Sequence, residues 1–194
     1  LNNDAPIDQI KGIIFRKNDD VVKTESREPI DLNDRPWPAR HLLPMKRYLS
    51  VPPTMPLPYP ATDIEASRGC VGNCKYCQPV LRNMFGHGVR NRTPEEIIDE
   101  IELLIKKYGI KGLNIGNDEP LMEKEFVIKF CKEIIKRKIK IKFICANRVD
   151  TVYEDIMPLL KKAGFIAFSF GVESGSQDIL NSMYKSWATP EKII

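Results

Sequence analysis

The chain has 194 residues, 42% of them hydrophobic and 29% charged, which is typical of a globular protein with one good core or two small ones. Basic residues exceed acidic ones by four (30 against 26), so charge gives no signal for nucleic acid or an anionic membrane. Apolar runs such as residues 165–172 are far shorter than the roughly 20 residues that span a bilayer, and the polar start is not a signal peptide. Because the five cysteines are odd in number and three of them are closely spaced, we expect a reducing, cytoplasmic location and not a disulfide-stapled fold.

The first third of the sequence predicts a hairpin followed by a connector. Residues 11–27 carry two β-branched and aromatic arms around the turn-forming run KNDD. Nine of the fifteen prolines then fall between Pro29 and Pro60, where the backbone can donate few hydrogen bonds. Residues 28–62 are therefore predicted to be an extended connector that lies against a domain surface.

From about residue 64 the sequence alternates between strand and helix patterns. Short apolar and β-branched runs predict strands at residues 64–67, 112–116, 141–146 and 165–172. Apolar side chains at helical spacing predict helices at residues 94–109, 123–138 and 155–163.

The first of these helices carries the clearest boundary signals. Thr93 and Glu96 form the pattern of a capping box, and Pro94 occupies the first helical position. Gly109 follows the last turn, as is typical of a helix end. In the third predicted helix Pro158 is tolerable if it lies in the first turn, where amide groups have no intrahelical partner.

The strict order of strand, helix, strand and helix implies right-handed βαβ units, an α/β fold and a parallel sheet. Functional groups of such a sheet gather at the carboxyl ends of its strands. A further helix pattern begins at residues 189–191, just before the sequence ends, and no initiating Met is present. We therefore expect a piece of a longer protein, with residues 1–27 as the hairpin at the end of an upstream domain.

The run RGCVGNCKYC places Cys70, Cys74 and Cys77 within eight positions. Iron-sulfur clusters are usually held by cysteine thiolates, and a cluster of four irons normally takes four, so three nearby thiolates leave one iron open. Gly69 and Gly72 give the loop the backbone freedom to wrap three corners of such a cluster. Three thiolates and His87 would also suit zinc, so a zinc-stabilised, non-catalytic binding module is an alternative.

The pattern Cys-x3-Cys-x-Tyr-Cys directly after a predicted strand resembles the signature of radical S-adenosylmethionine (SAM) enzymes, and Tyr76 fills the aromatic position before the last cysteine. The resemblance implies a partial TIM-like barrel over residues 63–194, with Cys70, Cys74 and Cys77 holding a 4Fe-4S cluster. It also implies an enzyme whose open iron binds SAM and whose reduced cluster splits the sulfonium to a 5'-deoxyadenosyl radical. An electron donor such as flavodoxin or ferredoxin, and a small-molecule or unknown substrate, would be the partners.

Two segments after later strands resemble SAM-binding parts of this family. The family's Gly-Gly-Glu-Pro motif, which receives the ammonium of SAM, is similar to a run of five residues here, although an Asn-Asp pair stands where a second glycine is common: Gly116, Asn117, Asp118, Glu119 and Pro120. GVESGS resembles the fourth-strand segment, so Glu173 and Ser174 are implied to contact SAM. An ordinary turn and a helix cap are the alternatives for these two segments.

Three further residues are assigned from the pattern alone. Arg148 follows the third predicted strand and could pair with a carboxylate of SAM or substrate, or lie on the surface. Cys131 lies on the apolar face of its helix and is predicted to be core. Cys145 is also expected to fill space.

The front of the chain is similar to the junction between a cobalamin-binding domain and the barrel in cobalamin-dependent radical SAM enzymes. That resemblance implies cobalamin, bound by a region absent from this chain, and reactions such as methylation or ring formation. A methylthiotransferase is the alternative within the family, although it would normally bring a second cysteine trio upstream and an RNA-binding module.

Overall fold

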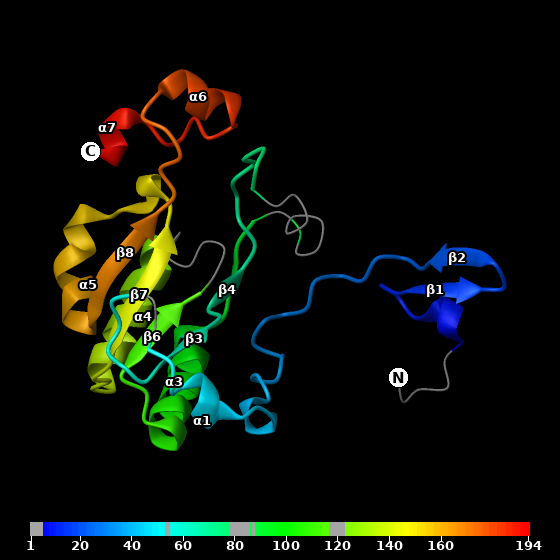
Figure 1. The fold of residues 1–194 in the computed structure, drawn as a ribbon, viewed down its shortest axis with the longest axis horizontal. Helices are drawn as coiled ribbons and strands as arrows, with labels where there is room; N and C mark the ends of the chain where they lie inside the picture. Colours follow the sequence, from blue (N-terminus) through cyan, green and yellow to red (C-terminus); the bar gives the residue numbers. More distant parts are fainter. Residues whose placement is uncertain (1–5, 53–54, 78–85, 87, 117–122) are drawn as a thin grey trace. The chain divides into compact units, whose positions relative to one another are not determined.

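The computed structural model describes residues 6–52, 55–77, 86, 88–116 and 123–194. The chain divides into two compact units, Leu1–Asp31 and Leu32–Ile194. The larger unit contains the predicted sheet and the cysteine motif, so it is the one that positions the candidate site (Figure 1).

The small unit is the predicted hairpin. Strands β1 (Ile14–Lys17) and β2 (Asp20–Lys23) pair antiparallel after a 3-10 turn at Ile7–Gln9. Asn18 makes the turn with a positive φ of 56°, which asparagine tolerates better than most residues. The hairpin prediction for residues 11–27 is confirmed.

The large unit is built on a parallel sheet in the order β3-β6-β7-β8, as the α/β prediction required. Its strands are β3 (Ala61–Ile64), β6 (Gly112–Ile115), β7 (Lys142–Asn147) and β8 (Phe165–Phe170). The first strand was predicted at residues 64–67, which is wrong by three residues. The pairing of Ala61 with Gly112 places the strand earlier, where its mixed polar sequence gave little signal.

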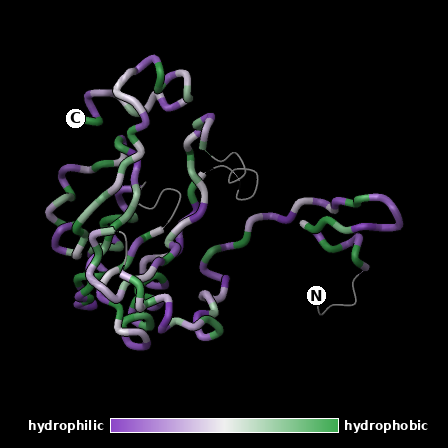
Figure 2. The backbone as a smooth tube through the Cα atoms, in the orientation of Figure 1, coloured by the Kyte–Doolittle hydropathy of each residue, from purple (hydrophilic) through white to green (hydrophobic). Residues whose placement is uncertain are grey.

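Three helices cover one face of this sheet and bury the core. They are α3 (Pro94–Tyr108), α4 (Lys124–Lys136) and α5 (Met157–Ala163), the last one preceded by a 3-10 turn at Glu154–Ile156. Hydrophobic and hydrophilic residues alternate along the chain (Figure 2), and no described helix is both long and apolar enough to cross a bilayer. The three predicted helices are confirmed, with Pro158 in the first turn of α5.

A row of phenylalanine rings links α4, β7 and β8 and runs from the core to the partly exposed Phe170. Neighbouring ring centroids lie 5.3 to 6.5 Å apart along Phe126, Phe130, Phe143, Phe165, Phe168 and Phe170. The pairing of β7 with β8 is irregular between Phe143 and Ile144, where one residue is inserted. Ala167 therefore pairs with Ile144 and Ser169 with Ala146, while Phe165 and Phe168 pack at the hydrophobic core.

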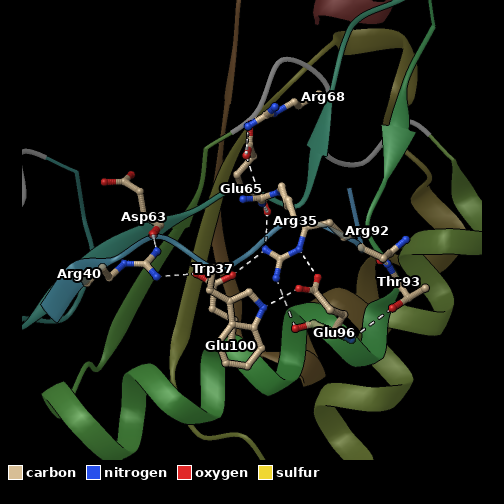
Figure 3. Close-up of polar contacts among 11 residues, drawn as sticks. Arg35, Trp37, Arg40, Asp63, Glu65, Arg68, Arg92, Thr93, Glu96 and Glu100 are labelled. Carbon is tan, nitrogen blue, oxygen red and sulfur yellow. Dashed lines mark hydrogen bonds and ion pairs between the residues drawn. The ribbon is translucent and has the colours of Figure 1, made fainter. Parts of the chain in front are cut away.

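The connector packs against α3 through charged side chains (Figure 3). It holds a 3-10 turn at Arg40–Leu42 and the short helix α1 (Met45–Tyr48). Arg40 pairs with Glu100, and Trp37 donates its indole hydrogen bond to Glu96. These contacts hold the start of the large unit to its first long helix.

The predicted capping box at the start of α3 is only half formed. Thr93 accepts a hydrogen bond from the Glu96 amide at 3.3 Å, and Gly109 ends the helix with φ 63°. The Glu96 carboxylate, however, binds Arg92 and Trp37, so the Thr93 amide donates to Asn33 at 2.7 Å. The hydrogen bond from the Thr93 amide to the Glu96 side chain, which completes a capping box, is therefore replaced by contacts with residues outside the motif.

Candidate active site

The cysteine motif lies between two short strands that pair with each other. Strand β4 (Ser67–Arg68) pairs antiparallel with β5 (Arg90–Asn91), so the two ends of the loop are held together. Gly69 has φ 91°, and a Cβ there would lie 2.1 Å from the carbonyl oxygen of Gly88. Only glycine fits this position, which lies just past the carboxyl end of β3.

Cys70 and Cys74 flank the backbone of Gly72. The Gly72 amide donates to Cys70 Sγ at 3.2 Å. A Cβ built on Gly72 would lie 3.3 Å from Cys70 Sγ and 3.8 Å from Cys74 Sγ. A side chain at position 72 would therefore crowd both sulfur atoms. Cys77 is exposed, and its amide donates to the Cys74 carbonyl in a turn.

Tyr76, in the same loop, meets a buried lysine that sequence reasoning missed. Lys185 is 3% exposed, and its ammonium donates to Tyr76 Oη at 3.0 Å, to Glu173 Oε1 at 3.1 Å and to the Gly171 carbonyl. Lys185 lies 109 positions from Tyr76. The only local signal for it was a single lysine between apolar and aromatic residues in MYKSW.

Hydrogen bonds among Lys185, Tyr76 and Glu173 favour the charged forms of the lysine and the glutamate. The hydrogen bonds from Lys185 and then from Tyr76 hold the pKa of the Glu173 carboxyl below its usual value. Burial opposes the charge on Lys185, but hydrogen bonds to Tyr76 and Glu173 leave its pKa above the ordinary lysine value. Burial likewise raises the pKa of Tyr76. At neutral pH the group is therefore a charged lysine, a carboxylate and a neutral phenol.

Two other predicted site residues lie near this group. Arg148, after β7, makes a bidentate ion pair with Asp150 at 2.8 and 2.6 Å and stacks 3.8 Å over the Trp187 ring. Its Nη1 lies 3.7 Å from the Cβ position of Gly72, beside the cysteine loop. Ser174 accepts a hydrogen bond from the Ser176 amide at 3.1 Å, so it shapes the turn before α6 (Gln177–Ser182).

Gly116 follows β6, and its amide donates to the Ile64 carbonyl at 3.0 Å. The rest of its motif, Asn117 to Pro120, and His87 lie outside the described residues. Beside Gly116 the structure shows a polar pair that the sequence did not reveal, in which Asn114 donates to Asp63 Oδ1 at 2.7 Å across β6 and β3. Gly116, Arg148 and Glu173 thus all lie past the carboxyl ends of strands.

Cys131 and Cys145 are fully buried in the core, as predicted. Burial raises the pKa of Cys131 to about 12 and shifts that of Cys145 upward as well. Such thiols are poor metal ligands because metals bind the thiolate. Of the described cysteines, Cys70, Cys74 and Cys77 therefore remain the candidates for metal binding.

The model of the Radical SAM superfamily matches residues 64–194, more than half of the chain. The chain belongs to the radical SAM superfamily. Its members use a 4Fe-4S cluster and S-adenosylmethionine, and the predicted family and fold class are confirmed.

Relatives of this radical SAM chain catalyse different reactions. The anaerobic magnesium-protoporphyrin IX monomethyl ester cyclase of Rubrivivax gelatinosus is 30% identical over 91% of this chain and 31% of its own length. An uncharacterised methyltransferase of Pyrococcus horikoshii is 29% identical over the whole chain and 40% of its own length. The chain thus spans less than half of the length of these relatives.

Solved structures show the same fold. The cobalamin-dependent S-adenosylmethionine radical enzyme OxsB, in its apo form, matches with a TM-score of 0.68 and 23% identity over 97% of this chain and 27% of its own. The parallel sheet and its covering helices therefore have the fold of this solved structure.

The cysteine loop fits the family's cluster in its donors and in its space. Its three thiols share one short loop, a backbone amide donates to Cys70 Sγ, and glycine at position 72 keeps a side chain from crowding two of the sulfurs. Among the described residues, no three His, Cys, Asp or Glu side chains converge on one metal ion. A four-iron cluster does not require such convergence, because each thiolate binds a different iron.

Proposed function

We propose that this chain carries the cluster-binding and SAM-binding core of a cobalamin-linked radical SAM enzyme that methylates or cyclises a small molecule. The observation that carries the proposal is the cysteine loop, which holds Cys70 and Cys74 around Gly72 at the carboxyl end of β3. When bound, the reduced cluster would supply the electron that cleaves the sulfonium of SAM.

The chain's own residues would hold and orient these groups. Cys70, Cys74 and Cys77 would bind three irons and leave the fourth open. Glu173 is a carboxylate at neutral pH and suits the ammonium or ribose hydroxyls of SAM. Glu119 is proposed to receive the ammonium, as the family resemblance implies.

The cobalamin part of the proposal rests on the front of the chain and on the relatives. OxsB is named as cobalamin-dependent, and its structure matches nearly all of this chain. We propose that residues 1–27 end a cobalamin-binding domain and that residues 28–62 connect it to the core. A small-molecule substrate is supported by the tetrapyrrole cyclase among the relatives.

Anaerobic reconstitution with iron and sulfide tests the proposal. We expect close to four irons per chain and a reduced cluster whose electron paramagnetic resonance signal changes when SAM is added. Cys74→Ala should lose most of the iron, whereas Cys131→Ala, which removes a buried thiol outside the loop, should keep it. Stoichiometric zinc in a colourless protein, or full iron content in Cys74→Ala, would refute the assignment.

The methylthiotransferase alternative requires a second iron-sulfur cluster and therefore more cysteines. A second cluster would need three further thiolates, whereas the two cysteines outside the loop, Cys131 and Cys145, are buried in the core with raised pKa values. Iron near eight atoms per full-length protein would favour that alternative, and iron near four would favour the cobalamin-linked enzyme.

A further inference from the structure

Residues 183–187, which we call the clasp segment, lie directly against the cysteine loop. The Lys75 amide donates to the Met183 carbonyl at 2.9 Å, a backbone bond between parts of the chain far apart in sequence. The Lys75 ammonium also lies 4.3 Å from the centroid of the Tyr184 ring. Tyr184 has a positive φ of 58°, which a bulky residue rarely adopts unless surrounding contacts hold it.

Within the clasp segment, the side chain of Lys185 is buried and makes three hydrogen bonds. A lysine ammonium has three N–H donors, and here three acceptors take them: the Tyr76 hydroxyl, the Glu173 carboxylate and the Gly171 carbonyl. Because Lys185 is buried, an ammonium without these partners would cost free energy of desolvation. The three hydrogen bonds therefore hold Lys185 in place and also hold its three acceptors.

The three acceptors come from two different sides of the candidate site. Tyr76 belongs to the cysteine loop, between Cys74 and Cys77, whereas Gly171 and Glu173 follow the carboxyl end of β8. Glu173 itself has a positive φ of 65°, a backbone conformation uncommon for glutamate. One ammonium thus joins the cysteine loop to the segment that follows β8.

We infer that Lys185 is a positioning residue, which holds the cysteine loop through Tyr76 and the SAM-facing carboxylate of Glu173 in the geometry required for cofactor binding. The inference deepens the proposed function and depends on it only for the identity of the cofactor. A preorganised site loses less conformational entropy on binding, so the expected effect of Lys185 is on loop order and on SAM affinity.

The first test measures amide hydrogen exchange in the chain without its cluster. Lys185→Met keeps much of the length of the side chain and removes the donors, so exchange at Lys75 should become at least about tenfold faster. Lys185→Arg retains donors and should stay within about threefold of the unsubstituted chain. Tyr76→Phe removes only the hydroxyl of an exposed ring, so it tests the loop-side bond without risk to the fold.

A control separates a positioning role from general destabilisation. Ile101→Val removes one methyl group from the core on α3 and should lower the melting temperature. It should leave the exchange rate of the Lys75 amide by local opening unchanged. Exchange in Lys185→Met within about twofold of the unsubstituted chain would overturn the inference. An equal increase in Ile101→Val would overturn it as well.

The second test uses the reconstituted chain. Lys185→Met should bind iron normally and weaken SAM about tenfold or more in calorimetry, with partial recovery in Lys185→Arg. Unchanged SAM affinity in Lys185→Met with an intact cluster would refute the positioning role alone. Failure of the unsubstituted chain to assemble a cluster would instead refute the proposed function, and the exchange experiment would still decide the role of Lys185.

Discussion

Arg92 has a fully buried side chain whose charge is matched from several sides. Its guanidinium lies 2.7 Å from Glu100 Oε2, donates to the Glu65 carbonyl at 2.7 Å and contacts the Glu96 carboxylate (Figure 3). Glu100 is 1% exposed, so it too is removed from water. Burial disfavours the charge on Arg92, yet the bonds to Glu96 and Glu100 raise its pKa above the ordinary arginine value.

Removal of one member of this buried pair should be costly. We expect Arg92→Met to lower the free energy of unfolding by about 3–5 kcal/mol, because Glu100 would keep a buried charge with Arg40 as its remaining partner. Urea denaturation monitored by circular dichroism would measure the loss. Lys124→Met, at an ion pair whose side chains are 40% and 65% exposed, is the control and should cost no more than about 1 kcal/mol. Equal losses in the two variants would contradict this reading of the network.

At the scale of single elements, the strands that close the cysteine loop impose a strict condition on Gly69. We expect Gly69→Ala to destabilise the loop by about 1–3 kcal/mol, because its Cβ would collide with the Gly88 carbonyl at an already positive φ. Iron bound after reconstitution would fall with it. Gly175→Ala, where a Cβ meets no atom within 4 Å, is the matched control. Full iron content in Gly69→Ala would show that β4 and β5 do not set the loop geometry.

Helices α3 and α4 are joined at their surface by Arg137. It donates to Glu133 Oε1 at 2.8 Å within the α4 region and pairs with Asp99 and Glu102 on α3, the latter at 3.3 Å. Hydrogen bonds from Arg137 and then from Lys136 lower the pKa of Glu133 below its ordinary 4.5. A carboxyl whose folded pKa is lowered adds stability above its unfolded pKa, and this stability is lost as pH falls through the folded value.

Glu133→Gln should therefore lower the melting temperature at pH 7 and have a smaller effect well below pH 4.5, where the carboxyl of the unsubstituted chain is also protonated. Thermal unfolding of both proteins across this range measures the difference. A gap between the two melting temperatures that widens toward acid pH would contradict the assignment.

The comparison of elements shows what the sequence could predict and what it could not. The hairpin and α3 were predictable because their signals are local: a turn run between two arms, and a cap, a proline and a glycine at fixed offsets. Strand β3 was misplaced because its sequence, ATDI, has no clear alternation and its position is set by pairing with β6. The cysteine spacing revealed the loop, but the link from Lys185 to it was missed because Tyr76 lies 109 positions away.

For the whole molecule, Leu32 marks the start of the large unit, and the residues just after it pack against α3. Leu32 is 1% exposed, and Asn33, Trp37 and Arg40 bind the first turns of α3. The connector from residue 32 onward is thus packed as part of the core unit, consistent with the expectation that it lies against a domain surface.

Two truncations separate these roles. A chain that begins at residue 32 should keep the melting temperature of the core unit, because the sheet, its helices and the Arg92 network are all retained. A chain that begins at residue 41 loses Trp37 and Arg40 and leaves Glu100 with Arg92 alone, so it should lose at least about 3 kcal/mol. For a protein of this size, that loss corresponds to a drop of about 6 °C or more in calorimetry. If both truncations melted together, the connector would be a linker after all, and the ion pairs of Arg40 would contribute nothing to the fold.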